Sequence, residues 1–358
     1  MVAADAEKPR AVLNGRLTPA ADEGRSGRRR AAEEPALPGG GSGRPPDPEA
    51  AHPVLVAEPA AVEEPVLTDL PEVTTRAIRV RGTVLHLAEA GPPDGPLTLL
   101  LHGFPEFWYG WRHQIGPLAA AGLRVVAPDQ RGYGASGKPK DLGAYHLDEL
   151  AADVIGLADA FARDRIRLVG HDWGGVVAWQ CAARYAERVE RAAILNAPHP
   201  DVFFGYVGRH PTQILRSSYM GLFQLPWLPE ALLRAGDFAL LRRALAGSSR
   251  PGTFDAAALD RYARAWSEPG ALTGMLNWYR GLRLPRRPLP DPVRPPVLIL
   301  WGERDTALEA GLAEASLARC AAGEIRHFPE ATHWVQHEEA AEVNRALLTF
   351  LTGAAATA

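Results

Sequence analysis

A carboxylate stands at the centre of the pentapeptide GHDWG at residues 170–174, which follows the apolar run 165–169. The spacing Gly-x-nucleophile-x-Gly is typical of a sharp turn from a strand into a helix, called a nucleophile elbow. The turn strains the backbone of its central residue, and only small residues two positions to either side avoid a clash. A carboxylate held there can attack carbon and form an ester, which water must then resolve. The motif therefore predicts that Asp172 is a nucleophile.

A nucleophile that forms an ester also needs a base to activate water and an acid to orient that base. In a chain of alternating strands and helices the expected order is nucleophile, acid, histidine. Asp305 follows the predicted strand 297–301, and His333 lies between the last predicted strand and the final helix. Taken one at a time these residues have competitors, namely Glu303 and Asp201 for the acid and His327 and His337 for the base.

Two backbone N–H groups are candidates to stabilise the oxyanion. The sequence His-Gly-Phe-Pro at 102–105 directly follows the predicted strand 97–101. Its glycine lets the backbone approach a ligand, and its proline fixes the loop. The N–H of Phe104, together with that of Trp173 after the nucleophile, would form the oxyanion hole. Alone, the same four residues are equally consistent with an ordinary turn after a strand.

Short apolar runs predict the strands of a sheet. Those from residue 97 onward are mostly continuous, as expected of strands covered on both faces. Strands that alternate with helices indicate a largely parallel, doubly wound α/β sheet. The predicted strands are 76–80, 83–88, 97–101, 123–127, 165–169, 191–195, 297–301 and, more weakly, 324–328. The predicted helices include 147–163, 174–186 and 337–351.

The alternation stops between about 200 and 290, where the sequence is helical and rich in aromatic residues. We predict that this stretch is a cap inserted between two parts of one core, at 75–199 and 291–353. Residues 1–70 are rich in Ala, Pro, Gly, Arg and Glu, and no aromatic residue precedes Phe104. Such a segment cannot bury enough apolar surface to offset its ordering entropy, so we predict a disordered tail.

Composition limits the partners. The net charge of −3 gives no electrostatic reason to expect nucleic acid or an anionic membrane. Cys181 and Cys320 are too few for a disulfide framework or a metal cluster, which fits a reducing compartment. No run approaches the ~18 consecutive apolar residues of a membrane span. The stretch after residues 28–30 is acidic and broken by Pro and Gly, so it lacks the apolar core of a signal peptide. We expect a cytoplasmic protein.

Several segments resemble those of epoxide hydrolases with the α/β-hydrolase fold. These segments are HGFPEFWYGWRHQI, PDQRGYGAS, GHDWGG, NAPHP, WGERD and THW. The cap segments SSYMGLFQLPWLPE and SEPGALTGMLNWYRG are similar to those of the vertebrate group of types three and four. The resemblance covers about 75–353 and is specific, because it extends into the cap. The vertebrate members carry an N-terminal membrane anchor, where this chain has a polar sequence.

The resemblance implies two tyrosines in the cap that hold the epoxide oxygen. By motif position these are Tyr219 and Tyr279, with Tyr279 the stronger candidate for the proton donor. An alkoxide leaving group is far more basic than a phenol, whose pKa is about 10, so a neutral phenol can donate a hydrogen bond and then its proton. The substrate would be a small apolar epoxide, with water as co-substrate and no metal or cofactor. The predicted pocket residues are His102, Pro105, Trp108, Phe223, Trp278 and Trp334.

Three other functions compete with this interpretation. A haloalkane dehalogenase shares the Asp nucleophile, the tryptophan after it and the histidine, but would need halide-binding donors in place of the tyrosines. A non-catalytic ligand-binding protein need not retain the complete set of catalytic residues. A serine esterase is disfavoured because no serine occupies the elbow. The sequence leaves the oligomeric state open between monomer and homodimer.

Overall fold

The computed structural model describes Leu70 and residues 72–353. Its centre is an eight-stranded sheet with the order β1-β2-β4-β3-β5-β6-β7-β8. The strands are β1 (Thr74–Val80), β2 (Thr83–Ala90), β3 (Leu97–Leu101), β4 (Arg124–Pro128), β5 (Ile166–His171), β6 (Val189–Leu195), β7 (Val297–Gly302) and β8 (Gly323–Phe328). Every strand predicted from the sequence is therefore confirmed, with ends that differ by a few residues.

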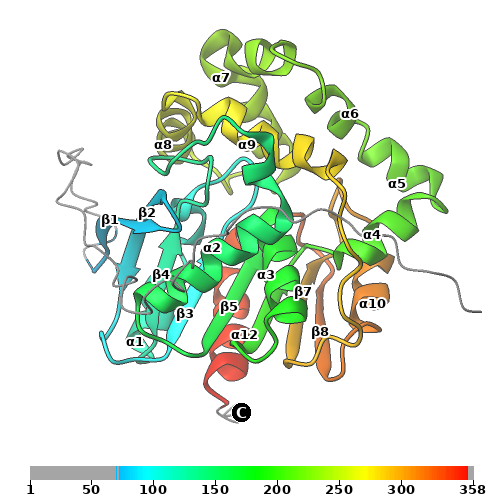
Figure 1. Cartoon of the computed structure of the whole chain (residues 1–358). Coiled ribbons are helices and arrows are strands. Elements are labelled where there is room, and N and C mark those ends of the chain that lie inside the picture. The colour runs from blue at the N-terminus through cyan, green and yellow to red at the C-terminus, as the bar shows by residue number, and fades with distance from the viewer. Residues whose placement is uncertain (1–69, 71, 354–358) are drawn as a thin grey trace, which may run out of the picture. The chain divides into compact units, whose positions relative to one another are not determined.

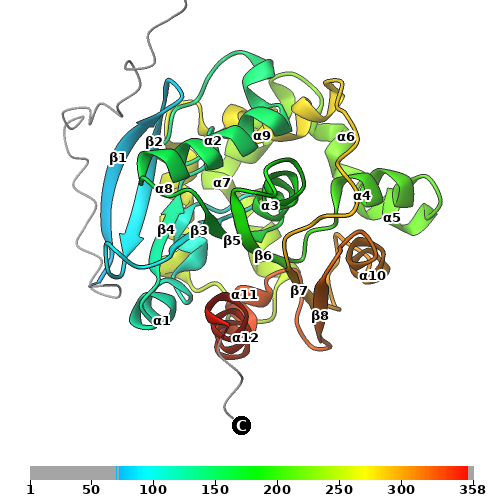
Figure 2. The same ribbon diagram turned by 60° about the horizontal axis from the view of Figure 1, so that its bottom comes forward.

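The sheet is antiparallel at one edge and parallel elsewhere. β1 pairs with β2 and β2 with β4 in antiparallel register, whereas all pairs from β4 through β3 to β8 are parallel. All five residues of β3 and all six of β7 are buried. Figures 1 and 2 show α2 and α3 on one face of the sheet and α1 and α12 on the other. Cover on both faces explains why these strands are continuously apolar.

The helices fall into two groups. Those that flank the sheet are α1 (Ile115–Ala120), α2 (Leu147–Ala160), α3 (Trp173–Arg184), α10 (Gly311–Leu317), α11 (Val335–Glu338) and α12 (Ala340–Thr352). Those between β6 and β7 are α4 (Pro200–Val207), α5 (Pro211–Arg216), α6 (Tyr219–Phe223), α7 (Leu228–Ser248), α8 (Ala256–Ser267) and α9 (Ala271–Arg280). Short 3₁₀ turns occur at Trp108–Trp111, Leu142–Tyr145 and Gly281–Arg283. The helix predicted at 337–351 is confirmed from residue 340 as α12, but the non-helical backbone of Glu339 separates it from α11.

The helices α4–α9 occupy the stretch predicted as a cap, and we keep that name for them. Figure 1 shows the cap above one end of the sheet strands. Two indole N–H groups tie it to the core: Trp266 donates to the carbonyl of Pro105 at 2.6 Å, and Trp278 donates to the carbonyl of Arg131 at 2.8 Å. These bonds fix the cap above the strand ends.

The predicted tail at 1–70 lies, apart from Leu70, outside the described residues. Among the helices that the structure describes, none combines the length and the apolar character needed to cross a membrane.

Candidate active site

The nucleophile elbow lies between β5 and α3. Asp172 has φ 50° and ψ −122°, a backbone conformation that L-residues rarely adopt. A Cβ added to Gly170 would lie 2.4 Å from the carbonyl oxygen of Gly174, and one added to Gly174 would lie 2.0 Å from that of Leu101. Both glycines are therefore required by close backbone contacts. The strain and the contacts together hold the Asp172 carboxylate above the N-terminus of α3.

The loop after β3 contacts this carboxylate directly. The backbone N–H of Phe104 donates to Asp172 Oδ1 at 2.8 Å. A Cβ on Gly103 would lie 2.4 Å from the same oxygen, so only glycine allows the loop to come this close. Trp173, the other predicted oxyanion donor, is the first residue of α3, where backbone N–H groups have no partner within the helix. The backbone N–H groups of Phe104 and Trp173 are thus the candidate donors to the Asp172 carboxylate, which we expect to become an ester.

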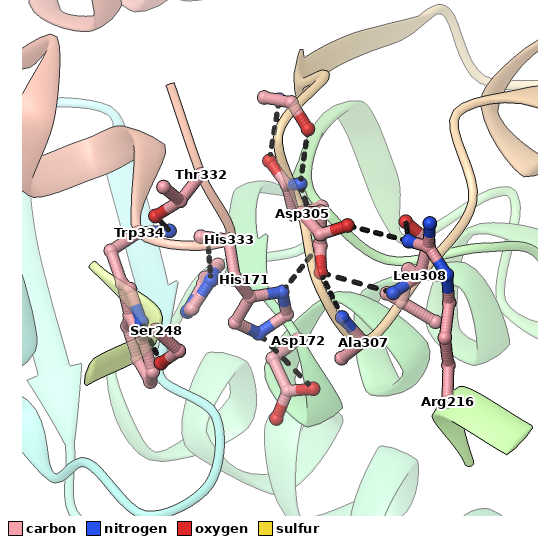
Figure 3. A network of polar contacts seen from close by, with 12 residues as sticks. His171, Asp172, Arg216, Ser248, Asp305, Ala307, Leu308, Thr332, His333 and Trp334 are labelled. Atoms are coloured by element: carbon pink, nitrogen blue, oxygen red, sulfur yellow. Dashed lines mark hydrogen bonds and ion pairs between the residues drawn. The ribbon is translucent and has the colours of Figure 1, made fainter. Parts of the chain in front are cut away.

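Asp305 and His333 meet Asp172 from two other strand ends. His333 Nδ1 lies 2.6 Å from Asp305 Oδ2, and His333 Nε2 lies 3.6 Å from Asp172 Oδ2 (Figure 3). Each of the three side chains follows a different parallel strand (β5, β7 or β8). Because the carboxyl ends of parallel strands meet at one edge of a sheet, residues distant in sequence come together there.

Asp305 is held as an anion by several donors. The Asn196 amide donates to its Oδ2 at 2.8 Å, and the backbone N–H groups of Ala307 and Leu308 donate to its Oδ1 at 2.7 and 3.0 Å. Burial raises the pKa of Asp305, but His333 and these hydrogen bonds outweigh it and leave the pKa below its ordinary value. The carboxylate can therefore orient the imidazole without taking its proton.

The charge of His333 depends on both carboxylates. Burial lowers the pKa of this imidazole, yet Asp305 and Asp172 together raise it from 6.5 to about 10. At neutral pH His333 is therefore an imidazolium between two carboxylates. An imidazolium cannot act as a base, so His333 could accept a proton only after the charge of one neighbour is removed.

The competing residues are engaged elsewhere. His327 lies in β8, where its ring nitrogens are 3.2 Å from a carboxylate oxygen of Glu303 and 3.1 Å from one of Glu314. Asp201 is paired with Arg286 at 2.5 Å. His337 lies in α11, where its Nε2 is 2.8 Å from a carboxylate oxygen of Glu106. None of these candidates is brought to the nucleophile.

The two cap tyrosines lie together over the elbow. Their ring centroids are 6.0 Å apart, and the Tyr279 ring packs edge-on against Trp173 at 5.1 Å and Phe104 at 5.2 Å. Tyr279 is buried, and burial together with Tyr219 and Asp172 raises its pKa well above the ordinary value. Burial of the Tyr219 hydroxyl and the Asp172 charge likewise raise the pKa of Tyr219, although 37% of the residue stays exposed. Both side chains are neutral phenols at physiological pH.

A cavity of about 70 Å³ joins these residues. This is several times the ~10–15 Å³ that a single water needs. Asp172, Tyr219 and Tyr279 are its reactive side chains, and most of the remaining wall is apolar. The full lining is Leu147, Asp172, Trp173, Val176, Ala197, Pro198, Pro200, Phe203, Phe204, Tyr219, Met220, Tyr279, Leu282 and Leu308.

The six residues predicted to line the pocket are not among these lining residues. Phe223 packs behind both tyrosines, with ring centroids 5.5 Å from Tyr219 and 5.0 Å from Tyr279. The indoles of Trp278 and Trp334 make hydrogen bonds to Arg131 and Ser248. His102, Pro105 and Trp108 lie in and after the loop that follows β3, where the His102 ring accepts from the backbone N–H of Gln130. These residues therefore make contacts within the protein and are absent from the cavity wall.

Sequence reasoning missed a buried polar network beneath the site. Glu106 Oε1 accepts from the Tyr262 hydroxyl at 2.5 Å and lies 2.8 Å from His337 Nε2. Its Oε2 accepts from Gln336 at 3.1 Å and lies 3.4 Å from His171 Nδ1. The Nε2 of His171 in turn donates to the carbonyl of His333 at 2.8 Å (Figure 3). The only signal in the sequence was the occurrence of polar residues within otherwise apolar stretches, which does not identify their partners.

Across Leu70 and residues 72–353, no cluster of three or more His, Cys, Asp or Glu side chains is arranged to hold a metal ion. Both cysteines are free thiols. Burial raises the pKa of Cys320 to about 11, so this thiol is a poor nucleophile.

Comparisons with known proteins agree with this geometry. Residues 96–340 match the family described as alpha/beta hydrolase fold. The chain is 45% identical to the AB hydrolase superfamily protein YfhM of Bacillus subtilis, over 78% of this chain and 98% of that protein. It is 38% identical to human epoxide hydrolase 4, over 82% of this chain and 83% of that protein. A crystal structure of an epoxide hydrolase from Bacillus megaterium with an inhibitor aligns with TM-score 0.71 and 31% identity, over 77% of this chain and all of that one.

Proposed function

Since the chain belongs to the α/β-hydrolase fold family and, within it, to the epoxide hydrolases, we propose that it converts an apolar epoxide into a vicinal diol through an ester on Asp172. The observation that carries this proposal is that Tyr219 and Tyr279 line one cavity with the carboxylate. When an epoxide opens, one carbon separates from the oxygen. The carboxylate can attack that carbon, and the neutral phenols can donate to that oxygen.

In the first step, an oxygen of Asp172 attacks an epoxide carbon. The new C–O ester bond forms as the bond between that carbon and the epoxide oxygen breaks. Tyr219 donates a hydrogen bond to the epoxide oxygen, and Tyr279 gives its proton to the same oxygen. The products are a hydroxyalkyl ester on Asp172 and a tyrosinate at Tyr279. The raised pKa values keep both phenols protonated until the alkoxide, a stronger base, develops.

Ester formation also changes the charge next to His333. The ester of Asp172 is neutral, so one of the two carboxylates that hold the pKa of His333 at about 10 is lost. The imidazolium then becomes more acidic while the tyrosinate is a strong base. One proton leaves the imidazole and one is taken up by the tyrosinate, so His333 becomes a base without net proton loss. Alkylation of Asp172 therefore prepares the second step.

In the second step, His333 Nε2 takes a proton from water and the hydroxide attacks the ester carbonyl. The N–H groups of Phe104 and Trp173 hold the oxyanion; the former already bonds Asp172 Oδ1 at 2.8 Å. The tetrahedral intermediate collapses, the alcohol oxygen leaves with the proton from His333, and the diol is released. The carboxylic acid left on Asp172 gives its proton to His333, which restores the carboxylate and the imidazolium, and one carboxylate oxygen now comes from water.

The origin of the oxygen atoms tests this mechanism. In a single turnover in ¹⁸O-water with excess enzyme and styrene oxide, the label should enter Asp172 and the first diol should be unlabelled. Label that appears directly in that first diol would exclude the ester. The His333→Gln variant serves as the matched control, because it should accumulate the ester without releasing diol.

The same assay separates the rival functions. A haloalkane dehalogenase would release halide from a chloroalkane and form no diol from styrene oxide. A non-catalytic binding protein would bind the epoxide without opening it. The tyrosine pair argues against the dehalogenase, because a halide is a weak base that needs hydrogen-bond donors and no proton donor.

A further inference from the structure

The exposed apolar surface of the described residues is concentrated in one part of the cap. Nine large hydrophobic side chains are exposed, and all of them lie between Phe204 and Leu240. Leu215 and Trp227 are the most open, at 75% and 73%. We define the apolar cap face as Ile214, Leu215, Leu222, Leu225, Trp227 and Leu232. Large exposed apolar patches on folded proteins mark interaction sites.

This face is supported from beneath. The Arg280 guanidinium donates to the carbonyls of Phe223 and Leu225 at 3.1 and 2.6 Å and pairs with Glu230 at 2.7 Å. These bonds anchor the segment between α6 and α7, which carries Trp227. Figure 1 shows α5, α6 and α7 following one another along the outer side of the cap. The face is therefore built on anchored structure.

Basic side chains outnumber acidic ones around this face. The stretch 202–243 contains five arginines and two acidic residues, whereas the whole chain has a net charge of −3. Both acidic side chains are neutralised locally, Glu230 by Arg280 and Asp237 by Arg242. The exposed side chains of Arg209, Arg234 and Arg243 have no acidic partner among the described residues. The stretch is thus apolar and cationic in a chain that is anionic overall.

We propose that the apolar cap face docks on the surface of an anionic lipid membrane. Apolar side chains with a tryptophan among them enter the boundary between headgroups and acyl chains, and the arginines are attracted by anionic headgroups. A second copy of the chain fits the face less well, because a two-fold contact would bring the same cationic surfaces together. The net charge of the chain predicted no attraction to anionic membranes, but it averages over this local distribution.

The location of the face gives the docking a use that rests on the proposed function. Phe204 and Tyr219 belong to the nine exposed residues and also line the cavity that contains Asp172. A docked cap would therefore hold this cavity close to the lipid phase. Apolar epoxides partition into that phase, so they would reach Asp172 without first dissolving in water.

Tryptophan fluorescence tests the docking without any turnover. Trp227 is 73% exposed, whereas the other eight tryptophans are at most 6% exposed. With the full chain, vesicles of phosphatidylcholine and phosphatidylserine should shift the emission to shorter wavelength and carry the protein to the pellet on sedimentation. Vesicles of phosphatidylcholine alone should do so much less, and added salt should weaken the binding. In the Trp227→Gln variant the shift should be absent.

Substitutions separate the apolar and cationic contributions. The double variant with Leu215→Gln and Trp227→Gln should lose sedimentation with anionic vesicles, and Arg209→Gln and Arg234→Gln should each weaken it about fivefold. Arg345→Gln, an exposed arginine on α12, is the matched control and should bind as the wild type does. In the absence of vesicles, all of these variants should hydrolyse a water-soluble epoxide as fast as the wild type does. If the wild type itself shows no hydrolysis, the proposed function is refuted, but the vesicle-binding result still stands.

Two results would overturn the docking proposal. Unchanged vesicle binding by the Leu215→Gln, Trp227→Gln double variant would place the membrane contact elsewhere in the chain. A blue shift that grows with protein concentration in the absence of vesicles, accompanied by a doubled mass in analytical ultracentrifugation, would show that a second copy covers the face.

Discussion

Replacing Asp172 by asparagine should make the His333 imidazolium a much stronger acid. His333 Nε2 lies 3.6 Å from Asp172 Oδ2, and Asp172 and Asp305 together hold the pKa of His333 at about 10 although burial lowers it. Asparagine keeps the size of the side chain and removes its charge. Two unit charges about 4 Å apart attract by about 4 kcal/mol at an effective dielectric constant of 20, which is a factor of about a thousand in the protonation equilibrium. We therefore expect the pKa of His333 to fall from about 10 toward its ordinary value of 6.5.

The assay is an NMR titration of the imidazole nitrogens in the wild type and in Asp172→Asn. The signal of His333 is assigned by its loss in His333→Gln. In the wild type the ring should stay protonated through neutral pH, whereas in Asp172→Asn it should lose its proton near neutrality. Mass spectrometry of the variant checks that deamidation has not regenerated the aspartate.

An unchanged pKa in the variant would refute the idea that alkylation of Asp172 releases the base. A neutral His333 in the wild type at pH 7 would do the same, because the base would then need no release. In either case the second step would have to obtain its base by another route, and the link between the two half-reactions that the 3.6 Å distance suggests would be lost.

Three further predictions concern the phenols, the acid and the loop glycine. Tyr279→Phe should slow ester formation by about 10²–10⁴-fold and Tyr219→Phe by less, as measured by rapid mixing of excess enzyme with epoxide. Asp305→Asn should destabilise the fold by about 3–5 kcal/mol while both partners are charged. Because the pKa of Asp305 is lowered from 3.8 and that of His333 is raised to about 10, the difference in thermal stability should shrink below pH 3.8 and again as the pH rises through about 10. Gly103→Ala should reduce kcat/KM on the order of a hundredfold, because its Cβ would lie 2.4 Å from the nucleophile's carboxylate; an unchanged rate with unchanged melting temperature would contradict this.

The parts of the site that were predictable from sequence depend on residues close together in the chain. The glycines around Asp172 are required by contacts of 2.0 and 2.4 Å, so their spacing alone identifies the elbow. Asp305 follows the apolar strand β7 and His333 follows the more polar strand β8, and parallel strands bring whatever follows them to one edge. Among several candidates, chain order therefore selected the carboxylate and the histidine that lie next to Asp172 in the structure.

What the sequence did not predict depends on which distant segments pack together. The cavity wall includes Ala197, Pro198 and Leu308, small or apolar loop residues whose types alone do not indicate that they line a cavity. The aromatic residues chosen in their place are buried behind the site, because large rings are used to fill the core. Two partners of Glu106 are distant in sequence: Tyr262 of the cap lies 156 residues further along the chain, and His337 of α11 lies 231 residues further. Such contacts follow from the fold and cannot be deduced from spacing.

The loop at 102–106 couples the two halves of the proposed reaction. Its Phe104 N–H bonds the nucleophile, the carbonyl of Pro105 accepts from Trp266 of the cap, and the carboxylate of Glu106 accepts from Tyr262 of the cap. The cap that carries the phenols is therefore positioned by the same loop that positions the oxyanion donor. A displacement of about 1 Å between reacting groups can cost a hundredfold in rate. Breaking the contact of either Trp266 or Tyr262 should thus slow the opening of the epoxide, although neither side chain lines the cavity.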